Sequence, residues 1–379
     1  MKILVLYQFN NHNQTVDLLC THLYSKGVLC DSFNITSFRF FSKSKSDYPL
    51  LIKILNPLMF IPKLRGLLIS LFRNKIIIKL SKNYTIIDIN FFSEIYDTLI
   101  PVFKEENKIV KTTIWGSDFY RVDAHRVEVQ RKLYKNVDCI QVASQRMLED
   151  FSKKYPEQKS KITLAHFGNN MFDSIENQLL KNDSFECKKG FGLPTDKIII
   201  VCATNGSEGQ QHEFMLESIK NLSTEIKNEL FIILPMAYGG GLEYQNKIKN
   251  SITQLNIPYK ILFSKLSVRD LSKLRIITDI IITIQKSDAF SAAIQEHLFA
   301  GSFLIAGDWL PYDIFQERGI FYTKTNLKNL TFSISEAYFK MESIKIACKE
   351  NKLLINNLSS WKNSVNDWIE IYNQLSKKQ

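Results

Sequence analysis

Residues 280–301 read IIITIQKSDAFSAAIQEHLFAG, which places a strand, a turn of small residues and the start of a helix in immediate succession. The run Ile280 to Ile284 is short and apolar except for Thr283, as is typical of a strand buried on both faces of a parallel sheet. The predicted helix opens at Ser291 to Ala293. Because a helix opening presents free backbone N–H groups and the positive end of the helix dipole, this stretch predicts a diphosphate site.

Two acids accompany the predicted helix opening. Asp288 lies in the turn, and Glu296 follows eight positions later, about one and a half turns into the helix. On that face the Glu296 carboxylate can accept two hydrogen bonds from hydroxyl groups, as a ribose diol would donate them. The small side chains of Ser291, Ala292 and Ala293 leave phosphates room to approach the backbone.

Short apolar runs alternate with helix-length amphipathic stretches along almost the whole chain, which is the pattern of βαβ units and parallel sheets. The first half contains six predicted strands: Ile3 to Tyr7, Val28 to Ile35, Ile86 to Asn90, Ile109 to Trp115, Cys139 to Ala143 and Ile162 to Phe167. A second series contains five: Ile198 to Ala203, Leu230 to Pro235, Tyr259 to Phe263, Ile280 to Ile284 and Phe303 to Ala306. The sequence therefore predicts an α/β protein with two Rossmann-like domains, a cleft between them, and ligands at the carboxyl ends of the strands.

The domain boundaries follow from this arrangement, and a chain of 379 residues also favours two domains. Residues 1–168 form the predicted N-terminal domain, and the polar stretch 169–196 is the predicted linker. Residues 197–350 form the predicted C-terminal domain, which carries the nucleotide-binding element. In the remaining residues, 351–379, large aromatic side chains recur at helical spacing, so this segment is predicted to form core-packed helices.

The composition is that of a globular protein with an anionic partner. Apolar residues make up 45% of the chain and charged residues 23%, which argues against disorder. The formal net charge of +11 favours nucleic acid, a nucleotide-activated substrate or an acidic membrane surface, and charge alone does not choose among them. The six cysteines form no CxxC pair or His/Cys cluster, so neither disulfides nor zinc are predicted and a reducing cytosol is expected.

The segment 42–80 interrupts the βαβ rhythm and is the predicted membrane contact. It carries eight cations against one acid, Asp47, with apolar clusters in between. No uncharged apolar stretch in it approaches the roughly 20 residues that a membrane span needs. Interleaved basic and apolar residues suit an interfacial segment, where each cation near an anionic leaflet contributes on the order of 1 kcal/mol. The alternative is a pair of core-packed helices with a solvated basic face.

The second half of the chain resembles the GT-B glycosyltransferases, and most closely the retaining family 4. The hallmark of that family is Glu-x-Phe-Gly-x-x-x-x-Glu-Ala-x-x-x-Gly, and this chain carries Asp288, Phe290, Ser291, Glu296 and Gly301 in the same register. The resemblance extends over roughly residues 195–325, and over the first half only in architecture. It implies that Glu296 binds the nucleotide ribose, that Asp288 meets donor-sugar hydroxyls beside Phe290, and that the final helix crosses back to the first domain.

The chain departs from the family pattern at the phosphates. Asp288 and Ser291 stand where the family has Glu and Gly. The loop after the first strand of the second domain offers an Arg and a Lys in the family, whereas here residues 204–212 read TNGSEGQQH, without a fixed cation. Lys265 or Arg269 is the predicted replacement.

A second likeness comes from two loops. Asn205, Gly206 and Ser207, together with the run from Pro235 through Tyr238 to Gly241, resemble the inverting lipid-linked aminosugar transferases of enterobacterial common antigen synthesis. These enzymes share the GT-B frame and act on a lipid diphosphate. The resemblance implies donor contacts for the first three residues and for Tyr238, and it leaves retention and inversion open.

The predicted acceptor site lies in the first domain, where residues 113–121 read TIWGSDFYR. This loop looks like the His-Gly-Ser-Asp loop of family 4, with Trp115 in place of His. Gly116 permits a sharp turn, Asp118 can accept an acceptor hydroxyl proton, and Arg121 can meet phosphate. The alternative for Asp118 is a helix cap. The predicted acceptor-binding residues are Trp115, Gly116, Ser117, Arg121 and His12, the last with a merely solvated loop histidine as its alternative.

These observations predict a glycosyltransferase of the hexosyltransferase class. It would move a sugar from a nucleoside diphosphate to a lipid-linked oligosaccharide, at the cytoplasmic face of the membrane, for a bacterial O-antigen or capsule. Retention is predicted; in an inverting mechanism Asp118 would be the base. No Asp-x-Asp motif lies beside a donor strand, so no metal and no cofactor are predicted, and amides and basic side chains would stabilise the diphosphate. A nucleic-acid-binding protein and a dehydrogenase are disfavoured, because their motifs are missing.

Overall fold

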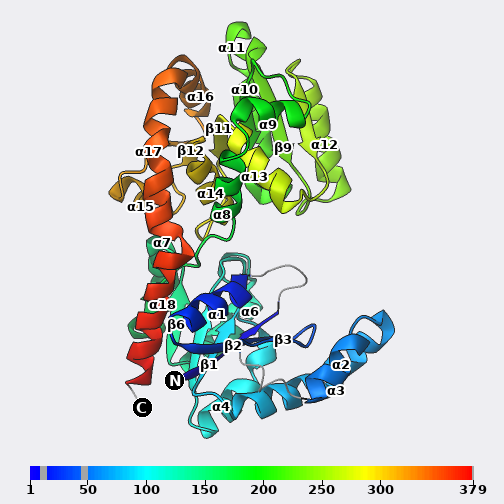
Figure 1. The fold of residues 1–379 in the computed structure, drawn as a ribbon, viewed down its shortest axis with the longest axis vertical. Helices are drawn as coiled ribbons and strands as arrows, with labels where there is room; N and C mark the ends of the chain where they lie inside the picture. Colours follow the sequence, from blue (N-terminus) through cyan, green and yellow to red (C-terminus); the bar gives the residue numbers. More distant parts are fainter. Residues whose placement is uncertain (9–14, 44–49, 378–379) are drawn as a thin grey trace. The chain divides into compact units, whose positions relative to one another are not determined.

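The computed structural model describes residues 1–8, 15–43 and 50–377. The chain divides into two compact units, which Figure 1 shows as ribbons. Unit 1 contains residues 1–168 and 361–379, and unit 2 contains residues 169–360. Each unit is built around one sheet with helices packed against it, so the predicted α/β class with two Rossmann-like units is confirmed.

Unit 1 has a seven-stranded sheet of order β3-β2-β1-β4-β5-β6-β7, parallel except between β2 and β3. Its strands are β1 (Lys2–Tyr7), β2 (Leu29–Asn34), β3 (Arg39–Phe41), β4 (Ile86–Asn90), β5 (Ile109–Thr113), β6 (Cys139–Val142) and β7 (Ile162–Leu164). All six predicted strands are confirmed, with ends that differ by at most three residues. The strand β3 is absent from the prediction, because three residues at an antiparallel edge are too few to show a periodicity.

The helices of unit 1 follow the strands in the expected alternation. They are α1 (Thr15–Ser25), α2 (Leu50–Leu58), α3 (Pro62–Ser81), α4 (Leu99–Glu105), α5 (Ser117–Tyr120), α6 (Ala124–Lys135), α7 (Gln145–Lys154) and α18 (Trp361–Ser376), with short 3-10 turns η1 (Glu94–Tyr96) and η2 (Pro156–Lys161). Within its described residues, the segment predicted to contact membrane begins directly after β3 and contains α2 and all of α3 except its last residue.

Unit 2 has a six-stranded parallel sheet of order β10-β9-β8-β11-β12-β13. Its strands are β8 (Ile198–Cys202), β9 (Leu230–Pro235), β10 (Tyr259–Leu262), β11 (Ile280–Thr283), β12 (Phe303–Gly307) and β13 (Thr323–Thr325). The five predicted strands are confirmed, and only the short polar β13 is absent from the prediction. Counted from β8, the order is 3-2-1-4-5-6, which is that of dinucleotide-binding Rossmann sheets.

The helices of unit 2 pack on both faces of this sheet. They are α8 (Phe172–Leu179), α9 (Ser184–Gly190), α10 (His212–Lys220), α11 (Thr224–Asn228), α12 (Leu242–Thr253), α13 (Val268–Ile277), α14 (Ala292–Ala300), α15 (Asp313–Glu317), α16 (Leu330–Phe339) and α17 (Met341–Ser359), with the 3-10 turn η3 (Glu208–Gln210). In β8, Ile200 and Cys202 join the core under α10, α12 and α16, while Ile199 and Val201 join the core under α8, α13 and α14. Burial on both faces explains why this strand is an uninterrupted apolar run.

Residues 169–196, predicted as a linker, form part of unit 2. They contain α8 and α9, and Phe172, Ile175 and Cys187 are buried in the core of that unit. Phe172 stacks on Phe299 with 4.3 Å between the ring centroids. The polar composition of the segment reflects its exposed face, while a few apolar residues at helical spacing hold it to the core.

The last helix, α18, belongs to unit 1, and the boundary lies at Trp361 rather than at residue 351. Tyr372 donates a hydrogen bond to Asp88 Oδ2 at 2.6 Å, and Lys111 Nζ pairs with the same oxygen at 2.7 Å, all with buried side chains. At the junction, a Cβ on Gly168 would lie 2.4 Å from the Trp361 ring, so glycine permits this close approach. Among the described residues, no helix is long and apolar enough to cross a membrane.

Candidate functional site

The topological switch point of unit 2 lies between β8 and β11, where the two halves of the sheet meet. In open α/β sheets, ligands bind outside the carboxyl ends of the strands at this point. The loop after β8 contains residues 203–211, and the loop after β11 contains residues 284–291. Five of the ten predicted donor-binding residues lie on these two loops, and three more lie on α14, which follows the second loop.

The loop after β8 begins and ends with a residue in the left-handed region. Ala203 has φ of +68° and Gln211 has φ of +62°. Such a backbone costs a non-glycine residue roughly 1–2 kcal/mol, so the surrounding contacts must hold the loop in shape. Within the loop, the Asn205 side-chain oxygen accepts the Ser207 amide at 3.0 Å, which fixes two predicted donor-binding residues relative to each other.

The glycine-rich loop after β9 packs backbone to backbone on the loop after β8. The Gly206 amide donates to the Tyr238 carbonyl at 2.8 Å. A Cβ on Gly240 would lie 2.3 Å from the Gly206 carbonyl oxygen, and one on Gly239, at φ of +99°, would lie 2.9 Å from the Ser207 amide nitrogen. The predicted donor residues of the two loops therefore lie together, and the approach depends on glycine. The Tyr238 side chain is exposed.

The loop after β11 is joined to the loop after β8 by direct hydrogen bonds. The Lys286 amide donates to the Gly209 carbonyl at 2.8 Å, and the side-chain amide of Gln210 donates to that of Gln285. In the loop after β12, Trp309 Nε1 donates to the Gln285 carbonyl at 2.8 Å. The loops after β9, β8, β11 and β12 thus form one continuous rim along the carboxyl edge of the sheet.

Asp288 closes the turn before α14. Its carboxylate accepts hydrogen bonds from the backbone amides of Ala289 at 2.8 Å and Ser291 at 3.1 Å, and from the Tyr312 hydroxyl. Burial raises the pKa of Asp288, and the hydrogen bonds oppose that shift.

The opening of α14 leaves two of the three predicted phosphate-binding amides available. The Ser291 amide is bound to Asp288, whereas the amides of Ala292 and Ala293 have no acceptor within the helix, as in any first turn. Ala292 is exposed and Ala293 half-buried. Phe290 packs on Phe315 with 5.6 Å between ring centroids, so this predicted donor residue anchors the turn to the core.

Glu296 forms a buried ion pair with Arg275 of α13. Arg275 Nε and Nη2 lie 3.0 Å and 2.9 Å from Glu296 Oε2, and Arg275 Nη1 lies 2.7 Å from His297 Nε2. Glu296 is 6% exposed; burial raises its pKa, while Arg275 and a hydrogen bond from the Asn169 side chain oppose the shift. Glu296, the residue predicted to bind the ribose, therefore has its carboxylate held in place by partners within unit 2.

Arg275 is missing from the sequence prediction, although the sequence carries a signal for it. It lies among Leu274, Ile276 and Ile277, which are all buried. An arginine in such an apolar run is seldom buried without an acid partner, so a buried carboxylate was to be expected nearby.

The cations predicted to meet the phosphates lie apart from the switch point. Lys265 and Arg269 are exposed, and Lys265 follows the edge strand β10. Three strand spacings, roughly 14 Å, separate β10 from β11. Lys286, which the prediction omits, is exposed in the loop after β11 and borders a groove of about 750 Å³ between α10 and α12. The sequence carries a signal for Lys286, because this lysine follows closely after a predicted central strand.

In unit 1, Asp118 organises the predicted acceptor loop. Oδ1 accepts the amides of Trp115 at 2.9 Å and Gly116 at 3.0 Å, and Oδ2 accepts the Phe92 amide at 3.0 Å. Burial raises the pKa of Asp118 to about 6, although these hydrogen bonds oppose the shift. With both oxygens bound to backbone, the geometry favours a structural role that ties the loops after β4 and β5 together. The catalytic role of Asp118 stays a prediction.

The other predicted acceptor residues surround the short helix α5. Gly116, at φ of +104°, precedes the helix, and Ser117 and Arg121 are exposed at its two ends. The Trp115 indole donates to Asn90 Oδ1 at 3.2 Å, and its ring lies 4.5 Å from that of Phe167. His12 lies outside the described residues.

Within residues 1–8, 15–43 and 50–377, no group of three or more His, Cys, Asp or Glu side chains is arranged to hold a metal ion. Independence of metal and cofactor stays a prediction from the sequence.

No protein-family model matches the sequence, and no curated protein matches it with significant similarity. Solved structures align with it over its whole length. A glycosyltransferase from Rickettsia africae ESF-5 aligns with a TM-score of 0.75 and 16% identity, covering 100% of this chain and 99% of that chain. HepE from Anabaena, in complex with UDP and glucose, aligns with a TM-score of 0.71 and 14% identity, covering 100% of both chains. A sucrose-phosphate synthase from Thermosynechococcus elongatus aligns with a TM-score of 0.70 and 13% identity, also covering 100% of both.

At sequence identities this low, the structural alignments establish the fold alone. The chain has the architecture of the GT-B glycosyltransferases, as its sequence predicts. A place in family 4 and the likeness to lipid-linked aminosugar transferases stay predictions.

Proposed function

We propose that the chain is a glycosyltransferase that takes its sugar from a nucleoside diphosphate. The observation that carries the proposal is the rim at the switch point of unit 2, where an open helix N-terminus stands beside two interlocked glycine loops. The Ala292 and Ala293 amides would bind the diphosphate through the helix dipole. The GT-B fold of the chain agrees with this chemistry.

Each side chain of the rim has a role in the proposal. Arg275 holds Glu296 in one orientation, so Glu296 would reach the ribose as a pre-positioned carboxylate. Asp288 already accepts three hydrogen bonds from its own unit, so it would accept hydroxyls of the donor sugar only through the lone pairs that these bonds leave. Lys286, tied to the loop after β8 through its amide, would supply the cation that residues 204–212 lack. The leaving diphosphate would then be stabilised by amides and a lysine, without a metal ion.

For the acceptor, we propose a lipid-linked oligosaccharide of a bacterial surface polysaccharide, such as O-antigen or capsule, used at the cytoplasmic face of the membrane. The support is the resemblance to family 4 and the basic, apolar segment 50–82. Retention is the favoured outcome, because the Asp118 oxygens are bound to three amides and a general base needs a free one. The interlocked Asn-Gly-Ser and Tyr-Gly-Gly loops favour the second candidate, an inverting transferase that acts on a lipid diphosphate.

A thermal-shift and calorimetric comparison of UDP, GDP, TDP and ADP tests the donor site. UDP comes first because HepE is described in complex with UDP-glucose. A nucleotide at 100 times its Kd stabilises the folded state by about 2.7 kcal/mol, so one of the four should raise Tm clearly. If none binds at millimolar concentration, the proposal is wrong. With the matching sugar nucleotide, the product anomer then separates retention from inversion, and full turnover in EDTA is expected.

A further inference from the structure

Helices α2 and α3 form a hairpin on unit 1 whose two sides differ sharply. Figure 1 shows the pair extending away from the sheet of that unit. Ile52 and Leu55 of α2 are buried, and the last turns of α3 are buried through Ile76 and Ile77. Near the turn between the helices, side chains of the hairpin also donate hydrogen bonds to the backbone of residues 36–38. The hairpin is thus anchored to unit 1 at several points, while other side chains along both helices are exposed.

The outer side of the hairpin carries an exposed apolar stripe. Eight large apolar side chains form it: Leu50, Ile54, Leu58, Phe60, Ile61, Leu64, Leu67 and Leu71. They recur every three or four residues along each helix, so they share one side of it. Phe60, in the turn between the helices, is 84% exposed, more than any other large apolar side chain among the described residues. Exposed apolar side chains gathered in one short segment are typical of an interaction surface.

The charge of the hairpin selects the partner. Residues 50–82 contain seven Lys or Arg and no Asp or Glu. A second copy of the chain docking here would bring like charges together, which disfavours self-association. A bilayer with anionic headgroups complements both features at once, since it offers phosphates to the cations and hydrocarbon to the apolar stripe.

We propose that the α2–α3 hairpin docks the chain on an anionic membrane, with Phe60 and Ile61 inserted at the boundary between headgroups and acyl chains. The 20 residues of α3 include five Lys or Arg, so the hairpin would lie in the interface and would not span the bilayer. This inference deepens the proposed function. The reason for docking rests on that function, because a lipid-linked acceptor would be presented at the membrane surface.

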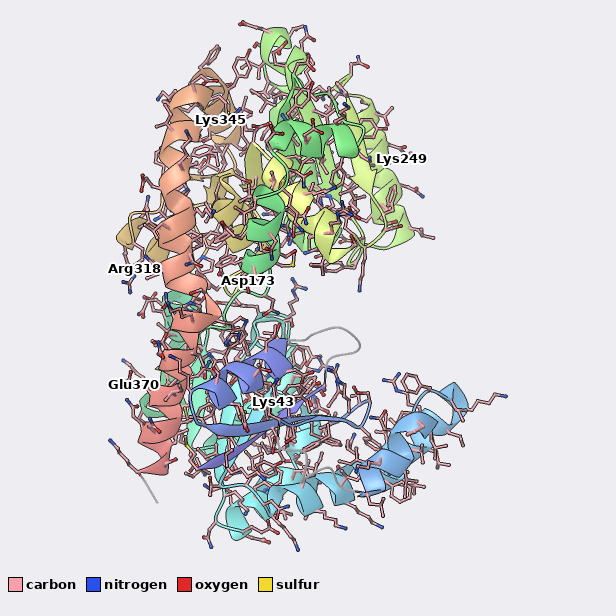
Figure 2. All side chains as sticks on the ribbon, viewed as in Figure 1. Lys43, Asp173, Lys249, Arg318, Lys345 and Glu370 are labelled. Atoms are coloured by element: carbon pink, nitrogen blue, oxygen red, sulfur yellow. The ribbon has the colours of Figure 1, made fainter. Side chains whose placement is uncertain are left out.

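The test uses the full chain and vesicles of phosphatidylcholine, alone or with phosphatidylglycerol, in a flotation assay. The double variant Phe60→Ser/Ile61→Ser removes the tip, and Phe339→Ser on α16 is its control, since Phe339 is 67% exposed. Lys63→Glu/Lys75→Glu reverses two hairpin charges, and Lys249→Glu on α12, labelled in Figure 2, is the control. We expect binding only to the anionic vesicles, at least tenfold weaker for both hairpin variants and unchanged for both controls.

Equal binding by all variants, or binding without regard to phosphatidylglycerol, overturns the inference. A concentration-dependent dimer that the Phe60 variant abolishes, without vesicle binding by the unaltered chain, would assign the surface to a second copy and also overturn it. Thermal shifts with the four nucleotides, measured on the same proteins, keep the two proposals separate. Vesicle binding without any nucleotide binding would remove the proposed function and leave the docking surface standing. A circular dichroism spectrum and a Tm like those of the unaltered chain show that the hairpin variants fold, which nucleotide binding cannot show because the hairpin belongs to unit 1 and the nucleotide site to unit 2.

Discussion

Arg275 and Glu296 form an ion pair buried inside unit 2, with side chains 6% and 8% exposed and 2.9 Å between Nη2 and Oε2. The pair links α13 to α14, the helix whose opening is the proposed diphosphate site. Since removal of one partner leaves a buried charge uncompensated, Glu296 has a structural role whatever it does for a ligand.

Glu296→Ala should therefore lower the free energy of unfolding by about 3–5 kcal/mol, because Arg275 loses its counter-ion. The double variant Arg275→Met/Glu296→Leu should recover part of this loss, as no charge is then left unpaired. Urea unfolding measures both. Glu336→Ala, which removes an exposed pair with Lys340, is the control and should cost less than about 1 kcal/mol.

The same double variant separates structure from binding. If Glu296 contacts the ribose, the double variant regains stability but not affinity for the nucleoside diphosphate, measured by calorimetry. Recovery of affinity together with stability would show that Glu296 only supports the fold.

Gly240 is predicted to be essential for the shape of the rim, and its neighbour Gly241 is not. Gly240→Ala places a Cβ 2.3 Å from a backbone oxygen of Gly206, so the two loops must separate. We expect a loss of about 1–3 kcal/mol in stability and weaker nucleotide binding. Gly241→Ala, with nothing within 4 Å of the added Cβ, is the matched control and should behave like the unaltered chain. Equal effects of the two changes on nucleotide affinity would contradict the assignment of the rim.

Asp118 should make unit 1 more stable as the pH falls. Its pKa is raised to about 6 by burial, so the folded state binds a proton more readily than the unfolded state, where a pKa near 3.9 applies. The resulting stabilisation is complete below about pH 3.9 and is lost as the pH rises through 6. Between pH 7 and pH 4 this group should add up to about 3 kcal/mol to the free energy of unfolding.

Buried His212 of unit 2 acts in the opposite direction, because its pKa is lowered to about 4 and its stabilisation is lost on acidification. The comparison must therefore be made against Asp118→Asn across pH 4 to 7 in urea unfolding. The difference between the two proteins should grow in favour of Asp118 as the pH falls. Parallel pH profiles would show that the carboxyl is not desolvated as the structure indicates.

The fold is predictable from the sequence because its strands are buried on both faces. Ile198 to Cys202 is apolar throughout and Ile280 to Thr283 is apolar except for its last residue, and such runs need no knowledge of their neighbours to be recognised. The sequence does not predict the helices α8 and α9, because their segment is polar and contributes only a few apolar residues, such as Phe172 and Cys187, to the core. Only packing against the rest of unit 2 distinguishes them from a linker.

The site is predictable only in part. The helix opening at Ala292 follows from local sequence, since a strand, a turn and small residues are contiguous. The partners of Glu296 and of Asp118 do not follow from local sequence, because Arg275 and Phe92 come from other elements of the chain. A carboxylate in a motif looks the same in sequence whether it faces a ligand or a buried arginine.

Lys286 is predicted to bind the diphosphate in preference to Lys265, because it lies in the loop after the central strand β11 and not after the edge strand β10. Lys286→Gln should weaken the binding of the nucleoside diphosphate about tenfold, which corresponds to one charged hydrogen bond of about 1.4 kcal/mol. Binding of the nucleoside without phosphates should not change. Lys265→Gln is the matched control at the other position, and calorimetry of both variants decides between them. A loss confined to Lys265→Gln would place the diphosphate nearer to β10, and the roles proposed for Ala292 and Ala293 would fall with it, because their amides lie on the β11 side of the sheet.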